Sequence, residues 1–308
     1  MNSSSSSPIH WRLAQLAAHL VVALVILVVI GGATRVMEAG LACPDWPLCF
    51  GSLLPGRQMN VQVFLEWFHR LDAFVVGLAL LFQLGAGLLW RVKLPRWLPW
   101  VYLLLVILVG FQGALGALTV LNLLPSAVVT AHLALALALL AVMSGLTQRL
   151  LMPNGFSAPL WWRLMSTGSL VAVIGQCLLG ARMASTWAAQ RCLTQGQGCY
   201  WLDLHRSSAM AVALFTLVFV FVSLVSGGWS RSQWPFLLAV SVLVLTQICL
   251  GIFTLKFSLQ QPFLTIGHQL IAALLVATLA ALSCRRPEEK REDLNHIADE
   301  PFLEPCHG

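Results

Sequence analysis

The sequence predicts an all-α integral membrane protein of eight transmembrane helices, arranged as two pseudo-symmetric four-helix bundles. Three observations support this fold class. The chain is 58% hydrophobic and 10% charged, with a mean hydropathy of +0.82, whereas soluble domains carry about 25% charged residues. Eight apolar stretches are long enough to cross a hydrocarbon core of about 30 Å at roughly 1.5 Å per residue. In addition, the second half of the sequence repeats the first.

The expected spans follow the apolar runs. The first run is too long for the core of a signal peptide, and no small-residue cleavage site follows it. Residues 1–12 are then an N-terminal tail, 13–150 and 151–284 the two halves, and 285–308 a tail expected to be disordered. The spans are expected at residues 13–33, 64–90, 98–121, 127–149, 160–182, 204–226, 235–255 and 263–284.

The basic residues predict the orientation in the membrane. Eleven lie in segments on one side and five on the other. Because loops rich in Lys and Arg stay in the cytoplasm, we expect both termini there and the loops 34–63 and 183–203 outside. Short basic clusters between apolar runs also explain the net charge of +6, so no nucleic-acid partner is expected. The eleven are Arg12, Arg91, Lys93, Arg96, Arg149, Arg163, Arg231, Arg285, Arg286, Lys290 and Arg291; the five are Arg35, Arg57, Arg182, Arg191 and Lys256.

The two halves share distinctive residues at a nearly constant spacing. Histidines recur 136 residues apart, and a Gln, Gly and Thr set recurs 135 residues apart. Because four spans return the chain to the same side, the two copies are expected to have the same orientation. The matched residues are His69-Arg70 with His205-Arg206, His132 with His268, and Gln112, Gly116 and Thr119 with Gln247, Gly251 and Thr254.

The four repeated histidines are expected at one depth. Each lies about five residues into a span that enters from the outer face, some 6–9 Å below the boundary at about 1.5 Å per residue. A single histidine there is more often a packing residue, but four at matched depth favour a function. Two imidazoles from facing helices can ligate one haem iron, whereas zinc or copper would need further ligands. We therefore predict two haem sites, His69 with His132 and His205 with His268.

Arginines directly follow the first histidine of each pair. Arg70 and Arg206 are suited to bind haem propionates, because the guanidinium group pairs bidentately with carboxylates. They are equally suited to extend towards the membrane surface. The two interpretations are compatible, and the sequence leaves both open.

A carboxylate accompanies only one of the two sites. Glu66 lies three residues before His69, on the same predicted helix face, and the matching residue of the second half is Leu202. A structural role is open, because an acid in the first turn of a helix is favoured by about 0.3–1 kcal/mol and Glu66 can pair with Arg70. In a functional role, the carboxylate would take protons or orient water beside the haem.

Two cysteine pairs lie in the expected outer loops. Outside the cytoplasm thiols pair readily, so the disulfides Cys43–Cys49 and Cys192–Cys199 are expected. Structural staples are the simpler interpretation, and redox-active pairs stay open. Neither pair has the spacing of a zinc site.

Several of these segments resemble the haem A synthase family, over about residues 12–284. The resemblance rests on Gly31-Gly32-Ala33-Thr34-Arg35, the Cys43–Cys49 loop, Glu66-Trp67-Phe68-His69-Arg70 and the repeated histidines. It implies an oxidoreductase that converts the methyl group of haem O into the formyl group of haem A for cytochrome oxidase assembly, with the oxygen taken from water. Cysteine pairs in both outer loops resemble the bacterial branch, which implies a bacterial cell membrane.

The resemblance also implies roles for individual residues. Carried over by position, Glu66, His69 and His132 form the substrate-haem site of the N-terminal half, with Glu66 as proton acceptor or water-orienting group. His205 and His268 ligate a haem b in the C-terminal half, which passes electrons.

Partners and alternative functions follow from the same pattern. Haem O is the implied substrate, and the sequence does not reveal the electron acceptor. Haem O synthase, cytochrome oxidase assembly factors and a second copy of the chain are candidate partners. A di-haem membrane cytochrome b that exchanges electrons with quinol, or a haem transporter or chaperone, would also use paired histidines. A cytochrome b would leave Glu66 and the outer cysteine pairs unexplained.

Overall fold

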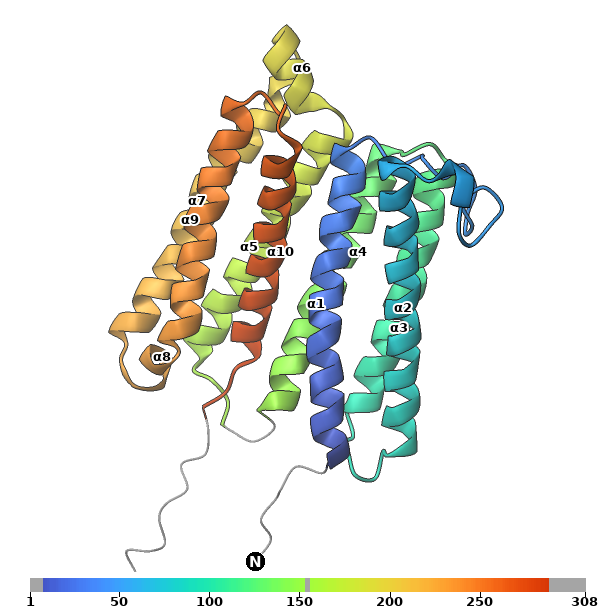
Figure 1. Ribbon diagram of the computed structural model, residues 1–308. Coiled ribbons are helices and arrows are strands. Elements are labelled where there is room, and N and C mark those ends of the chain that lie inside the picture. Colours follow the sequence, from blue (N-terminus) through green and yellow to red (C-terminus); the bar gives the residue numbers. More distant parts are fainter. Residues whose placement is uncertain (1–7, 153–155, 288–308) are drawn as a thin grey trace, which may run out of the picture.

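The computed structural model describes residues 8–152 and 156–287, and α-helices dominate this part of the chain (Figure 1). Eight of the described helices are long and apolar enough to cross a membrane, which confirms the predicted fold class. Residues 1–7 of the expected N-terminal tail and 288–308 of the expected C-terminal tail lie outside the described residues. The eight helices are α1 (Pro8–Val36), α2 (Val61–Leu89), α3 (Leu98–Leu121), α4 (Ser126–Leu151), α5 (Leu160–Ser185), α7 (Cys199–Val225), α9 (Trp234–Lys256) and α10 (Pro262–Cys284).

The observed helices extend beyond several of the predicted spans. Hydropathy identifies the part of a helix that is apolar enough for lipid, but the helix continues until a residue ends it. The start of α7 at Cys199 rather than 204 is the clearest case. Sequence reasoning missed the short helices α6 (Ala188–Gln195), α8 (Gly228–Ser232) and η1 (Gly56–Gln58). The left-handed backbone of Trp187 and Gly196 bounds α6, and an apolar pattern does not reveal such ends.

The helices contact one another in two rings of four. In the N-terminal half α1, α2, α3 and α4 each pack against the next, and α4 closes the ring on α1. In the C-terminal half α5, α7, α9 and α10 form the same closed ring. Figure 1 shows the two bundles side by side, with the long loops 37–60 and 186–198 at one end and α8 at the other. This arrangement is consistent with the predicted duplication.

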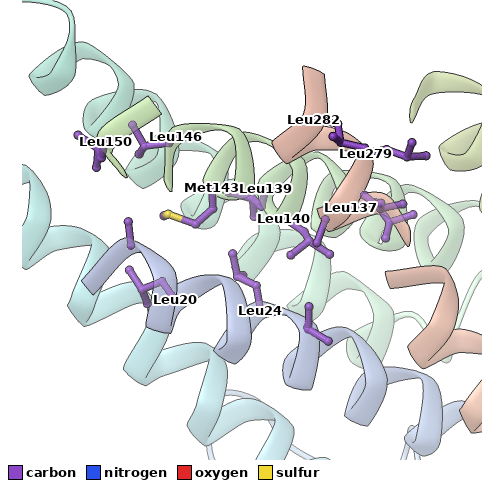
Figure 2. Close-up of a cluster of buried hydrophobic side chains, with 14 of the residues drawn as sticks. Leu20, Leu24, Leu137, Leu139, Leu140, Met143, Leu146, Leu150, Leu279 and Leu282 are labelled. Carbon is purple, nitrogen blue, oxygen red and sulfur yellow. The ribbon is translucent and has the colours of Figure 1, made fainter. Parts of the chain in front are cut away.

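The halves meet along α4 and α10, with α1 against α10 and α5 against α4. Figure 2 shows the side chains that fill this interface. Since lipid tails are as apolar as leucine, the interface is stabilised by close packing rather than by removal of apolar surface from water. The residues drawn include Leu20 and Leu24 of α1, Leu137, Leu140, Met143 and Leu146 of α4, and Leu279 and Leu282 of α10, all of them buried.

Small residues permit the closest approach of α4 and α10. A Cβ atom added to Gly145 would lie 2.8 Å from Sγ of Cys284 and 3.7 Å from the backbone oxygen of Ala280. The hydroxyl of the adjacent Ser144 donates to the backbone oxygen of Ala277 at 2.6 Å. The interface between the halves is therefore intolerant of added volume at Gly145.

We expect Gly145→Leu to destabilise the protein by about 1–3 kcal/mol, because overpacking must push α4 and α10 apart. Thermal unfolding in detergent, followed by the loss of monodisperse protein, measures the effect. Gly110→Leu is the matched control, since a Cβ atom at Gly110 meets no other atom within 4 Å. Equal unfolding temperatures for the two variants would show that the α4–α10 contact is not tight.

Candidate functional site

The first histidine pair is brought together inside the N-terminal bundle. His69 of α2 and His132 of α4 face each other with ring centroids 6.5 Å apart and ring planes at 66°. A metal–imidazole bond is about 2 Å, and with about 1.2 Å from nitrogen to ring centre two imidazoles on opposite sides of one metal have centres about 6.4 Å apart. The observed spacing therefore fits two axial ligands of one iron.

The second pair occupies the matching place in the C-terminal bundle. His205 lies on α7 and His268 on α10, two helices of the same ring of four. His132, His205 and His268 each lie six residues beyond the first residue of their helix, and His69 lies eight beyond. The helices confirm that all four histidines are near one end of the bundles.

A glycine on a neighbouring helix lies against each histidine. Added Cβ atoms at these glycines would be 2.9–3.3 Å from Cε1 of the facing imidazole. A side chain at any of the four would push the ring out of place. The four contacts are Gly31 with His69, Gly116 with His132, Gly180 with His205, and Gly251 with His268.

Glutamine amides contact three of the histidines. The amide nitrogen of Gln112 lies 3.3 Å from Nε2 of His132, and that of Gln247 lies 3.1 Å from Nε2 of His268. These are two of the repeated residues identified from the sequence. Gln176 of α5 approaches the other ring nitrogen of His205, at 3.0 Å from Nδ1. Such contacts hold the rings in a defined orientation, as expected around metal ligands.

Nitrogens of the paired histidines also remain available. Nδ1 of His69, His132 and His268 is buried without a hydrogen-bond partner among the described residues. Buried polar atoms of this kind are rare and call for an explanation such as a ligand or an ordered water. The donor chemistry of both histidine pairs and the ring spacing of the first pair fit haem in both halves.

Glu66 and Arg70 are tied to the first outer loop. The Glu66 carboxylate is buried, forms an ion pair with Arg70, and accepts a hydrogen bond from the backbone N–H of Cys43 at 2.8 Å. Arg70 also donates to the backbone oxygens of Asp45, at 2.6 Å, and Leu48. The i, i+4 pair considered from the sequence is therefore present, and the loop contacts are an addition that sequence reasoning missed.

The first outer loop is itself held by a disulfide and by hydrogen bonds within the loop. The Cys43–Cys49 disulfide is formed, as predicted. The backbone N–H groups of Gly51 and Phe50 donate to the Asp45 carboxylate and hold its pKa below the usual range. The loop therefore holds one oxygen of Glu66 through the Cys43 N–H, and Arg70 of α2, itself bonded to the loop, holds the other.

The second outer loop lacks this arrangement. The predicted Cys192–Cys199 disulfide joins α6 to the start of α7, but Leu202 stands in the place of Glu66. Arg206 is exposed, in contrast to the half-buried Arg70. The asymmetry expected between the two sites is therefore present in their surroundings.

Two arginines link the halves near the sites. Arg35, from the glycine-rich motif at the end of α1, donates to the backbone oxygen of Ala184 at 2.7 Å and stacks 3.7 Å from the ring centroid of Trp187. Arg182 of α5 donates to the hydroxyl of Ser126 at 2.6 Å, at the start of α4. Each half thus has one arginine that contacts the other half.

Comparison with known proteins now decides the family. The family model described as cytochrome oxidase assembly protein matches residues 14–280. The chain belongs to this family. The match spans both histidine pairs and both outer loops, so the resemblance inferred from the motifs is confirmed.

Individual relatives agree with the family match. The chain is similar to a protein named heme A synthase from Bradyrhizobium diazoefficiens, with 30% identity over 92% of this chain and 93% of the relative. A heme A synthase from Halalkalibacterium halodurans is 27% identical over 84% of this chain and 91% of the relative. The match to a heme A synthase from Shewanella oneidensis reaches 32% identity but spans about half of each chain, 54% and 55%.

We expect Gly180→Val to remove the haem between His205 and His268, because the added side chain displaces the His205 ring. Optical spectra and haem quantification of the purified protein measure this, with His205→Ala as the reference for loss of that haem. Gly175→Val is the matched control on the same helix, where a Cβ atom meets no other atom within 4 Å. Full haem content in Gly180→Val or His205→Ala would contradict the assignment.

Proposed function

We propose that this protein is a haem A synthase, an oxidoreductase that converts the methyl group of haem O into the formyl group of haem A. The observation that carries the proposal is the facing pair His69 of α2 and His132 of α4, with Glu66 one turn before His69. The family match and the relatives named heme A synthase support it.

The reaction defines which molecules, protons and electrons the protein must bind or transfer. Conversion of a methyl group to a formyl group with oxygen from water consumes one water and releases four protons and four electrons. The protein must therefore hold the porphyrin in a fixed orientation, supply water, accept protons, and pass electrons to an acceptor outside the chain. The proposal assigns these tasks to the two halves.

The N-terminal half, residues 13–150, holds the substrate. His69 and His132 would ligate the iron of haem O and so orient the porphyrin. Glu66 takes a proton or orients the attacking water, a role that suits a carboxylate held at both oxygens. Arg70 and the Cys43 amide keep it in place.

The C-terminal half, residues 151–284, holds a resident haem b between His205 and His268. When bound, this haem supplies a one-electron carrier between the substrate and the external acceptor. Gln176 and Gln247 fix the orientation of its two ligands. Leu202 in place of Glu66 leaves this half without a carboxylate at the corresponding position, as an electron carrier requires no proton acceptor there.

We place the protein in a bacterial cell membrane as a multi-pass protein. The distribution of basic residues assigns both termini to the cytoplasm and the disulfide-bonded loops to the outer side. Both histidine pairs then lie near the outer surface, where the disulfides are stable.

The decisive experiment is extraction of the pigment after co-expression with a source of haem O. A haem A synthase yields haem A. A di-haem cytochrome b or a haem transporter returns the porphyrin unchanged, and that result would overturn the proposed function.

We expect Glu66→Gln to retain bound haem but to stall at haem O or an alcohol intermediate, with haem A formation slowed by about 10²-fold or more. The amide has the same size, but it cannot take a proton. Chromatography of the extracted haems measures the products, and an optical spectrum confirms that haem is bound.

A control separates this role from support of the loop. Asp45→Asn weakens the same loop, because the Asp45 carboxylate accepts hydrogen bonds from Phe50 and Gly51 and does not contact Glu66. Stalling in Glu66→Gln with normal products in Asp45→Asn supports a chemical role. Wild-type haem A yield from Glu66→Gln would remove the carboxylate from the mechanism.

A further inference from the structure

An acidic residue lies within the membrane on the same helix face as His69. Asp72 of α2 is three residues beyond His69, and Val76 and Leu80, which continue this face, are buried. Oδ2 of Asp72 is buried and has no hydrogen-bond partner within the described part of the chain. Acids in a transmembrane helix are costly and usually have a function. Sequence reasoning missed Asp72, although an acid in addition to Glu66 inside an apolar span was a visible signal.

The duplication provides an internal comparison for this residue. At the repeat spacing of 136, Asp72 corresponds to Ser208. The hydroxyl of Ser208 donates to Oε1 of Gln176 at 2.7 Å, and the amide nitrogen of Gln176 lies 3.0 Å from Nδ1 of His205 and donates to its backbone oxygen at 2.7 Å. In the C-terminal half, a neutral amide therefore bridges the histidine and the residue one turn beyond it.

The N-terminal half has no such bridging side chain. Gly31 packs against His69 as Gly180 packs against His205, which aligns α1 with α5 at a spacing of 149. At this spacing Leu27 corresponds to Gln176. Its side chain cannot form hydrogen bonds. Nδ1 of His69 and Oδ2 of Asp72 are therefore both left without a partner among residues 8–152 and 156–287.

We propose that Nδ1 of His69 and the carboxyl group of Asp72 together bind a water molecule, which makes Asp72 a positioning residue for the ligand of the substrate haem. This inference rests on the proposed function. His69 Nδ1 and the Asp72 carboxyl supply two polar partners, within the range of about 2–4 that a buried water contacts. In the other half the Gln176 amide takes the place of this water.

The arrangement has an electronic consequence. A ligating histidine whose second nitrogen donates towards a carboxyl group, here through a water, is a stronger donor to its metal than one without such an acceptor. Greater donation favours the oxidised iron and lowers its reduction potential. The haem between His69 and His132 therefore has a lower potential than the haem between His205 and His268. Electrons then move favourably from the substrate half to the C-terminal half.

The test is an optical redox titration of the purified chain loaded with haem O, with ferric low-spin signals recorded by electron paramagnetic resonance. Asp72→Ser copies the C-terminal half, and Asp72→Asn removes the acid at constant size. Both raise the midpoint potential of the N-terminal haem and leave that of the C-terminal haem unchanged. Asp203→Ser, which removes an exposed acid of α7, shifts neither.

A reciprocal variant keeps the proposal falsifiable if Asp72 variants lose haem. Gln176→Leu combined with Ser208→Asp transfers the N-terminal arrangement to the C-terminal half and lowers the potential of the haem there. Unchanged potentials in a protein with both haems overturn this inference alone. A wild-type chain that binds no haem between His69 and His132 overturns the proposed function as well.

Discussion

The structure depends on holding imidazole rings inside a lipid-exposed helix bundle. An uncompensated polar group in hydrocarbon is unfavourable, so each histidine must find a partner within the protein. Close helix contacts provide the geometry, because a glycine on the adjoining helix brings its backbone against the ring edge. The same contact fixes the ring plane, and in the N-terminal half it leaves two rings facing each other at a spacing that suits one iron. The close packing of the helices therefore also sets the geometry of the histidine ligands.

Duplication of this unit, followed by divergence, explains how one fold supports two proposed tasks. The scaffold of the two halves is alike in helix contacts, in the four glycine–histidine contacts and in the outer disulfides. The differences are concentrated within a turn of the first histidine or on the helix packed against it. Glu66 stands where the other half has Leu202, Asp72 where it has Ser208, and Leu27 where it has Gln176. One half carries acids at these positions, and the other carries a neutral amide network.

The outer loop of the N-terminal half extends this asymmetry beyond the membrane. Glu66 and Arg70 receive or donate hydrogen bonds at Cys43, Asp45 and Leu48, within the ring closed by the Cys43–Cys49 disulfide. A structural and a chemical role for Glu66 are therefore not alternatives. The loop that the carboxylate anchors also holds the carboxylate in a fixed position near His69, which suits a group that orients a water molecule.

The sequence by itself determined the eight spans, the duplication, both disulfides and the four histidines, because each is expressed in local hydropathy or in the spacing of rare residues. The tertiary structure decided what the spacing does not encode. Gln176 and the glycines Gly31 and Gly180 act across helices that are distant in sequence, so that no local pattern marks them. Asp72 was visible as an acid in an apolar span, but its significance came from Ser208 and Gln176, which show how the corresponding position is filled in the other half. Helix ends also escaped prediction, because a helix continues past the membrane until backbone geometry, as at Trp187 and Gly196, ends it.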